Sequence, residues 1–328
     1  IARECAAVLH GQAMPGFGTL TVQPCVNRQK RIMTVPEPEL DPAFAVVAPA
    51  SGLSVPVIFN SPHSGRTYPQ SFVRTSRLEL HRLRCSEDTF VEELFGAAPH
   101  HGAALMHANF PRAFVDLNRE PYELDPQMFD GALPSHANTR SMRVAGGLGT
   151  IARVVADSEP IYAARIPVAE ALSRIDTYYK PYHAALTSML DEARSRFGIA
   201  VLIDCHSMPS AKIARDERSK PDFVLGDRYG TSCTTFLADL VHQTLTELGY
   251  TVSRNKPYAG GFITERYGNP AAGLHALQIE INRGLYMDEL RYARTGGFAW
   301  LQADLNRLIQ ALDLAVPGGL ASPPIAAA

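Results

Sequence analysis

The sequence predicts an α/β fold in which helices cover a largely parallel sheet. Short apolar runs alternate with segments of helical periodicity along most of the chain, and this alternation is typical of that fold class. Hydrophobic residues make up 46% of the 328 residues and charged residues 20%, an ordinary globular composition that excludes fibrous and disordered proteins. The length suits one large α/β domain or about two average domains.

Seven apolar runs predict the strands, and they lie at residues 55–60, 103–108, 113–117, 199–204, 224–225, 251–253 and 274–281. Four helical patterns lie at residues 87–97, 167–196, 234–248 and 288–314. Within the second of these patterns Pro181 should kink or split the helix, because proline removes a ladder hydrogen bond and clashes with the preceding turn.

Both ends of the chain are expected to lie outside the folded domain. Residues 1–42 show no periodicity and end in a proline-rich run, so we predict an irregular or disordered lead-in. Residues 317–328 are mostly small and unpatterned and should form a flexible tail. The α/β domain then spans residues 43–316.

Charge and hydropathy exclude two kinds of partner. The chain has 31 basic and 33 acidic residues, whereas binding to nucleic acid or to an anionic membrane surface needs a large basic excess. No run approaches the roughly 18 apolar residues of a membrane span, and the N-terminus lacks a signal-peptide pattern. The five cysteines are scattered without a C-x-x-C pair. We therefore expect a cytoplasmic protein with reduced thiols.

Three polar clusters follow apolar runs, at the strand ends where α/β sheets bind ligands. The clusters lie at residues 60–65, 204–209 and 278–283. The first two contain His63 and His206, and imidazole with carboxylate suits a catalytic zinc site that keeps a fourth position for water. The carboxylate could come from Glu87 or Asp88, in the segment that opens a predicted helix.

The third cluster contains an acid in a strand. Ile279 and Ile281 form the apolar face of this strand, so Glu280 projects to the other face. Glu280 could be salt-bridged to Arg283, or it could be a general base that faces the crevice and accepts a proton from water. The pattern alone leaves both interpretations open.

Arginines in the loops could bind an acidic small molecule. Arg66, Arg119 and Arg283 lie within or beside polar motifs, and a guanidinium matches a carboxylate through two parallel hydrogen bonds. Surface salt bridges are the alternative. Cys205 cannot act with its neighbour His206, because adjacent residues of a strand point to opposite faces. The glycine-containing segments 146–150 and 258–264 lack nucleotide-binding spacing and should be flexible loops.

Five motifs together resemble the N-formylglutamate amidohydrolase family. They are SPHSGRTYP at 61–69, EDTFV at 87–91, DLNR at 116–119, DCHSMP at 204–209 and QIEINRGLY at 278–286. They follow the order of the family, and the resemblance covers about residues 56 to 314. It implies one three-layer α/β/α domain with a mainly parallel mixed sheet, similar to zinc carboxypeptidases and aspartoacylase.

The same resemblance implies an activity and a zinc site. Members of the family hydrolyse N-formyl-L-glutamate to formate and L-glutamate, the closing step of one route of histidine degradation. By motif, His63 and His206 would bind zinc together with Asp88, or with Glu87 as the alternative. Residue 66 is arginine, so the H-x-x-E spacing of the carboxypeptidases is absent. Glu280 would match their general base.

The resemblance also suggests how an acidic small-molecule substrate would bind. Asn118 and Arg119 are similar to the Asn–Arg pair that holds a substrate carboxylate in the broader group, and Arg283 or Arg66 would hold a second carboxylate. Two alternatives remain open from the sequence. One is a zinc deacylase or carboxypeptidase-like hydrolase acting on another N-acyl amino acid or small peptide. The other is a non-catalytic protein that binds zinc or an acidic metabolite.

Overall fold

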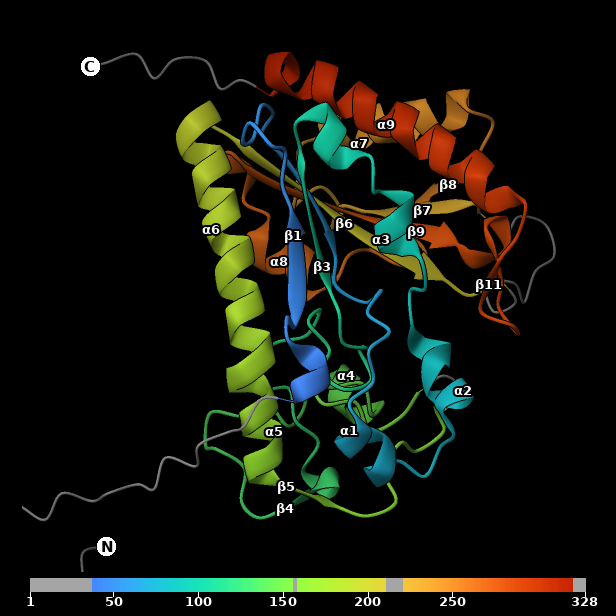
Figure 1. Ribbon diagram of the computed structural model, residues 1–328. Coiled ribbons are helices and arrows are strands. Elements are labelled where there is room, and N and C mark those ends of the chain that lie inside the picture. Colours follow the sequence, from blue (N-terminus) through green and yellow to red (C-terminus); the bar gives the residue numbers. More distant parts are fainter. Residues whose placement is uncertain (1–36, 156–157, 211–220, 321–328) are drawn as a thin grey trace, which may run out of the picture. The chain divides into compact units, whose positions relative to one another are not determined.

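The computed structural model describes residues 37–155, 158–210 and 221–320, and a seven-stranded sheet lies at their centre (Figure 1). The strands follow the spatial order β1-β3-β2-β6-β9-β7-β8. Their bounds are β1 (Phe44–Val47), β2 (Val57–Ser61), β3 (Ala104–Ala108), β6 (Ala200–Met208), β7 (Phe223–Gly226), β8 (Val252–Arg254) and β9 (Leu274–Asn282). Only the β1–β3 and β7–β9 pairs are antiparallel among these strands, so the prediction of a mainly parallel mixed sheet is confirmed.

Helices cover both faces of this sheet. The α-helices are α1 (Gln70–Thr75), α2 (Leu80–Leu83), α3 (Val91–Leu94), α4 (Met142–Ala145), α5 (Val168–Arg174), α6 (Lys180–Phe197), α7 (Thr235–Glu247), α8 (Phe262–Tyr267) and α9 (Gly297–Gly319). Residues of α3, α7 and α9 share one apolar cluster with one face of the sheet, and residues of α1, α5, α6 and α8 share the other. Figure 1 shows α6 apart from α7 and α9, across the strands. The three-layer α/β/α arrangement is therefore confirmed.

The longest helical region follows the predicted pattern closely. A π-helical segment, Ile175–Tyr179, joins α5 to α6, so the helix is continuous over residues 168–197. The disturbance lies just before Pro181, which cannot donate a hydrogen bond to the preceding turn. The helical hydrogen bonds span one additional residue at this point, so the helix continues through it. The helix ends at Gly198, whose φ of 78° suits a residue without a side chain.

One predicted strand is wrong. Residues 113–117 are buried but form turns, in which the backbone N–H groups of Phe114 and Val115 donate to the carbonyl oxygen of Pro111. The apolar run reflects burial and not pairing, because Phe114 packs between Phe72 and Tyr178. This turn later proves to carry part of the candidate site.

Two predicted helices begin too early. The pattern at 87–97 yields only the short helix α3, because the Asp88 N–H donates to the carbonyl of His63 and Phe90 has a left-handed φ of 70°. The pattern at 288–314 becomes a helix only from Gly297. Residues before it form a two-stranded ribbon of β10 (Met287–Asp288) and β11 (Ala293–Arg294).

Several short elements escaped the sequence patterns. These are the edge strand β1, the pair β4 (Phe129–Asp130) and β5 (Ile166–Pro167), and the helices α1, α2, α4 and α8. At the chain ends, residues 1–36 and 321–328 lie outside the described residues. A 3₁₀ turn, Pro38–Leu40, occupies the end of the predicted lead-in, and α9 continues three residues past 316, the predicted end of the domain. Among the described helices, none is both long and apolar enough to cross a membrane.

Candidate active site

The candidate site begins on one face of the strands β6 and β9. In β6, Leu202 faces the α6 layer, and Asp204 and His206 follow it on the same face at every second residue. In β9, Gln278 and Glu280 follow the same alternation. The two strands are parallel and pair Asp204 with Gln278 and His206 with Glu280, so these side chains lie beside each other.

Two loops bring further residues over the end of this face. His63 follows strand β2, the neighbour of β6, and Asp88 lies in the loop before α3. The backbone N–H of Asp88 donates to the carbonyl oxygen of His63 at 3.0 Å, which joins the two loops. Gly65 permits the close approach of this loop to residues 109–110, because a Cβ atom there would lie 2.2 Å from the Phe110 carbonyl oxygen.

His63, Asp88 and His206 come together as a buried group. Asp88 Oδ2 lies 3.1 Å from Nδ1 of His206 and 3.6 Å from Nδ1 of His63. The two imidazole rings have centroids 4.8 Å apart. One ligand atom of each residue lies within 4.8 Å of the other two, which is a suitable arrangement for a metal ion.

The other nitrogen of each imidazole faces a carboxylate. His63 Nε2 lies 2.8 Å from Asp116 Oδ1, and His206 Nε2 lies 2.9 Å from Asp204 Oδ2. A histidine that binds a metal commonly donates its second ring N–H to a carboxylate, which fixes the tautomer. The sequence motifs contain Asp116 and Asp204, but the sequence analysis assigned them no role. Asp204 lies two residues before His206 on the same strand face, so alternation could have indicated its contact, whereas Asp116 is 53 residues from His63 and its spacing carries no such sign.

The remaining oxygen of Asp88 is held by other donors. Asp88 Oδ1 accepts hydrogen bonds from Ser207 Oγ and from Arg283 Nη2, both at 3.0 Å. Glu87 points elsewhere and accepts from Tyr68 OH at 2.8 Å. Of the two predicted carboxylates, Asp88 is thus the one that faces both histidines.

Charge favours a cation between the histidines. Burial raises the pKa of Asp88, but the adjacent imidazoles, His206 first and then His63, outweigh it and hold this pKa well below the usual value. Burial lowers the pKa of His206, but the charge and hydrogen bond of Asp204 raise it well above its usual value. His63 Nδ1 is buried and has no hydrogen-bond partner among the described residues. Two imidazole nitrogens and a carboxylate oxygen around one point therefore fit a divalent metal such as zinc.

Glu280 lies beside this group with an unusual ionisation. Burial raises the pKa of Glu280 to about 7, although the nearby His206 opposes this shift. Gln278 Nε2 donates to Glu280 Oε1 at 2.8 Å and orients the carboxyl group. The strand projects Glu280 toward the cavity, as the sequence pattern allowed, and no described contact pairs it with Arg283.

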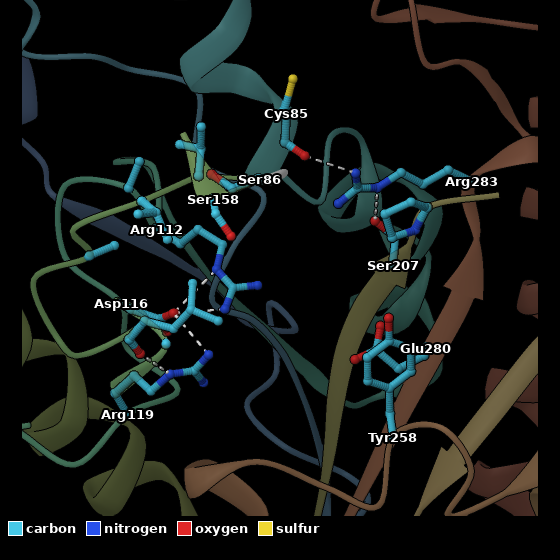
Figure 2. A pocket seen from close by; sticks show the side chains of 17 residues that line it. Cys85, Ser86, Arg112, Asp116, Arg119, Ser158, Ser207, Tyr258, Glu280 and Arg283 are labelled. Carbon is cyan, nitrogen blue, oxygen red and sulfur yellow. Dashed lines mark hydrogen bonds and ion pairs between the residues drawn. The ribbon is translucent and has the colours of Figure 1, made fainter. Parts of the chain in front are cut away.

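A cavity of about 410 Å³ opens above Glu280. Figure 2 shows Arg112, Asp116 and Arg119 on one side of it, and Glu280 with Tyr258 on the opposite side. A smaller cavity of about 280 Å³ shares Arg112, Arg119, Tyr258 and Glu280 with the first and extends to His63, Asn118 and His206. The two candidate ligand histidines, Glu280 and the arginines therefore line two adjoining cavities.

The arginines that line the cavities are not all those that the sequence predicted to bind substrate. Arg119 lines both cavities, and its guanidinium donates to the carbonyl oxygens of Leu148 and Asn118. Arg112 lines both cavities too, and the sequence analysis had passed over it. Asn118 lies against the metal group, with Nδ2 3.2 Å from His206 Nε2.

Two predicted substrate arginines have other contacts. Arg283 lines the larger cavity, but its donors bind Asp88, Ser207 and the Cys85 carbonyl oxygen, so its described contacts hold the candidate ligand Asp88. Arg66 lies outside the described residues that line the two cavities, and it pairs instead with Glu92 and Glu93 on α3.

Both glycine-containing segments lie at the site. Residues 146–150 form an irregular loop as predicted, whereas 258–264 form a loop only as far as Gly261, because α8 begins at Phe262. Gly146 and Leu148 line the larger cavity, and residues 257–261 line the smaller one. Gly261 packs on the side chain of Asn118, where a Cβ atom would lie 2.3 Å from Nδ2. On β6, Cys205 points to the opposite apolar layer, so it does not act with His206.

Comparisons with known proteins give a consistent result. The sequence model of a family described as N-formylglutamate amidohydrolase matches residues 55–287. N-formylglutamate deformylases from Pseudomonas putida and Pseudomonas aeruginosa are 30% and 31% identical over 238 residues, which cover 72% of this chain and 83% of each relative. The crystal structure of N-formylglutamate amidohydrolase from Ralstonia eutropha JMP134 is similar, with a TM-score of 0.78 and 41% identity. This match covers 83% of this chain and 97% of that structure.

Proposed function

The chain belongs to the N-formylglutamate amidohydrolase family, and from this premise we propose that it hydrolyses N-formyl-L-glutamate to formate and L-glutamate. The reaction is the hydrolysis of a linear amide bond. One observation carries the proposal beyond the family match. The buried group of His63, Asp88 and His206 lies beside Glu280 in a cavity that arginines line.

His63, Asp88 and His206 would hold a zinc ion. The donor set supports this assignment, because two imidazole nitrogens and one carboxylate oxygen leave a further coordination position open. When bound, zinc would supply Lewis acidity and would lower the pKa of water toward about 7. Asp116 and Asp204 would keep the Nε2 protons in place, so that both Nδ1 atoms remain available as ligands.

Glu280 would act as the general base and then as the general acid. It accepts a proton from the attacking water as the oxygen bonds to the formyl carbon, and it returns this proton to the departing nitrogen as the C–N bond breaks. Burial raises the pKa of this carboxyl group above its usual value, which favours a group that both accepts and returns a proton. The hydrogen bond from Gln278 keeps one oxygen of Glu280 in a fixed position during both transfers.

Arg112 and Arg119, with Asn118, would bind the carboxylates of an acidic small-molecule substrate. All three line the cavity that also contains the metal group, and a guanidinium recognises a carboxylate through paired hydrogen bonds. Arg283 would hold Asp88 instead, in agreement with its hydrogen bonds.

The first test is metal content together with formate release. We expect about one zinc ion per chain, and formate release from N-formyl-L-glutamate that a chelator abolishes and added zinc restores. Zinc without formate release would overturn the proposed substrate and leave other N-acyl amino acids or small peptides. Absence of metal after reconstitution would overturn the metal-dependent mechanism.

A cytoplasmic location and a role in histidine degradation complete the proposal. The cysteines in the described part of the chain, Cys85, Cys205 and Cys233, are free thiols, which is usual in a reducing compartment. Fractionation of cells that express the full chain, with formate release measured in each fraction, tests the location.

A further inference from the structure

Asp116 contacts both the candidate metal ligand His63 and arginines that line the cavity. Each of its two carboxylate oxygens makes a different set of these contacts. Oδ1 accepts a hydrogen bond from His63 Nε2 at 2.8 Å and another from the Asn118 backbone N–H at 2.9 Å. Oδ2 accepts from Arg112, with Nη2 at 2.7 Å and Nε at 3.2 Å. Arg119 Nη2 lies 3.7 Å from the same oxygen. One buried carboxylate therefore contacts a candidate metal ligand and the two arginines that line both cavities, Arg112 and Arg119.

Asp204 contacts His206, the other candidate ligand histidine, but in the described part of the chain it does not connect this histidine to the arginines of the cavity. Its Oδ2 lies 2.9 Å from His206 Nε2, and its Oδ1 accepts from Asn60 Nδ2 at 2.8 Å. Asn60 in turn accepts a hydrogen bond from the hydroxyl of Tyr182, a buried side chain on α6. This chain of contacts runs into the core, and no arginine bonds to Asp204 among the described residues.

We propose that Asp116 is a positioning residue that couples metal binding to recognition of the substrate carboxylate. It fixes the His63 tautomer, so that Nδ1 faces Asp88, and it holds the Arg112 guanidinium in the cavity at the same time. Displacement of the carboxylate would disturb both contacts together. The inference deepens the proposed function and rests on it for the identity of the metal and the substrate.

The chemistry of an amide makes the coupling testable. An asparagine at residue 116 has one acceptor oxygen, and its amide nitrogen only donates. If the oxygen faces His63, the amide nitrogen meets the donors of Arg112. If the oxygen faces Arg112, the amide nitrogen meets His63 Nε2 and favours the tautomer whose Nδ1 carries the proton. Asp116→Asn can therefore accept hydrogen bonds from His63 or from Arg112, but not from both.

The experiment compares Asp116→Asn with the matched variant Asp204→Asn in the zinc-loaded full chain. Three assays are made. They give zinc affinity by competition with a chelator, KM and kcat for N-formyl-L-glutamate at saturating zinc, and the rate at which phenylglyoxal modifies Arg112. Loss of a carboxylate that orients a ligand histidine typically costs about 10- to 100-fold in metal affinity. We expect this loss in both variants. Only Asp116→Asn should also raise KM and speed the modification of Arg112.

The outcomes separate coupling from a merely structural role. The proposal is overturned if Asp116→Asn and Asp204→Asn have the same KM and the same rate of Arg112 modification. It is also overturned if Asp116→Asn retains the zinc affinity of the wild-type chain. If the wild-type chain releases no formate, the proposed substrate fails. The coupling is then judged on zinc affinity and Arg112 modification alone, which need no substrate.

A second pair of variants applies if Asp116→Asn does not fold. Arg112→Gln removes the same contact from the cavity side, and Arg143→Gln removes a cavity arginine that pairs with Glu123 instead. We expect Arg112→Gln to lower zinc affinity, because Asp116 loses two hydrogen bonds that fix its position under His63. Arg143→Gln should leave zinc affinity unchanged. Equal zinc affinities in the two arginine variants would contradict the coupling.

Discussion

The two faces of the central sheet differ at the carboxyl ends of β6 and β9. The face toward α3, α7 and α9 stays apolar as far as Cys205 in β6 and Ile281 in β9, whereas the face toward α6 and α8 changes from apolar to polar before that point. The apolar side carries Ile203, Cys205, Ile279 and Ile281, and the polar side carries Asp204, His206, Gln278 and Glu280.

The difference shows that one face of a strand can pack in the core while its other face supplies polar side chains to the candidate site. Ile279 and Glu280 are adjacent in β9 and both are buried. Ile279 packs in a core cluster, and Glu280 lines the cavity. Substitution of Ile279 should therefore change the free energy of unfolding, and substitution of Glu280 should change turnover.

Glu280→Gln should give the largest effect, a loss of about 10²- to 10⁴-fold in kcat for formate release, because the general base is lost. Zinc affinity should be retained, since Glu280 is outside the ligand group. Burial raises the pKa of Glu280 from 4.5 to about 7, so the cost of ionising this side chain lowers stability progressively as pH rises between these values and is complete above 7, where glutamine should not lower stability. Formate assays, chelator competition and thermal unfolding measure the three effects. A variant that keeps full turnover would rule out the general-base role.

Ile279→Ala is the matched control on the opposite face. It should destabilise the fold by about 2–5 kcal/mol, because it removes buried apolar contacts and leaves a cavity. The kcat of the molecules that remain folded should stay close to that of the wild-type chain. Denaturant unfolding and kcat per folded chain test this, and a selective loss of kcat would mean that the two faces are not independent.

Asp88→Asn should lower zinc affinity by more than about 100-fold, because a ligand oxygen is lost and not only a residue that orients a ligand. Glu87→Gln is the matched variant one residue away. Glu87 accepts hydrogen bonds from Tyr68 and Arg84, so its loss should lower stability and leave zinc affinity unchanged. Chelator competition on both variants decides between the two carboxylates, and loss of zinc in Glu87→Gln alone would reverse the assignment.

The central features of the site could be predicted because they follow from alternation within strands. The pattern placed Glu280 opposite Ile279 and put His206 on the face away from Cys205, and both positions agree with the structure. The resemblance by motif then connected these residues to His63. Local sequence thus predicts which residues share a face.

Contacts between distant segments could not be predicted in this way. Asp116 lies in a turn that resembles a strand in sequence, and its contact with His63 depends on how that turn packs against the loop after β2. The arginines pose a similar problem. A long side chain can turn toward a cavity or away from it. Arg66 follows a polar cluster but pairs with Glu92, and Arg112 precedes an apolar run but lines the cavity.

The pH dependence of kcat/KM should report the ionisation of Glu280, because only the carboxylate accepts a proton. Activity should fall about tenfold for each pH unit below the pKa of Glu280. This pKa is about 7 without a bound cation, and a nearby positive charge favours the carboxylate and lowers it. The midpoint of the acid limb should therefore lie between the usual value of 4.5 and about 7. The rate profile of the zinc-loaded chain measures it, and a midpoint above 7 would contradict this account.

Arg66→Ala should give the smallest effect. The Arg66 guanidinium is one-third exposed and pairs with Glu92 and Glu93, and such partly exposed pairs contribute about 0–1 kcal/mol to stability. KM for N-formyl-L-glutamate should not change, because Arg66 lies outside the cavity lining, whereas Arg119→Ala should raise KM. Steady-state kinetics on the two variants make the comparison. A rise in KM for Arg66→Ala equal to that for Arg119→Ala would mean that the α3 side of the site moves toward the substrate on binding, and that the side chains now turned away from the cavity are part of it.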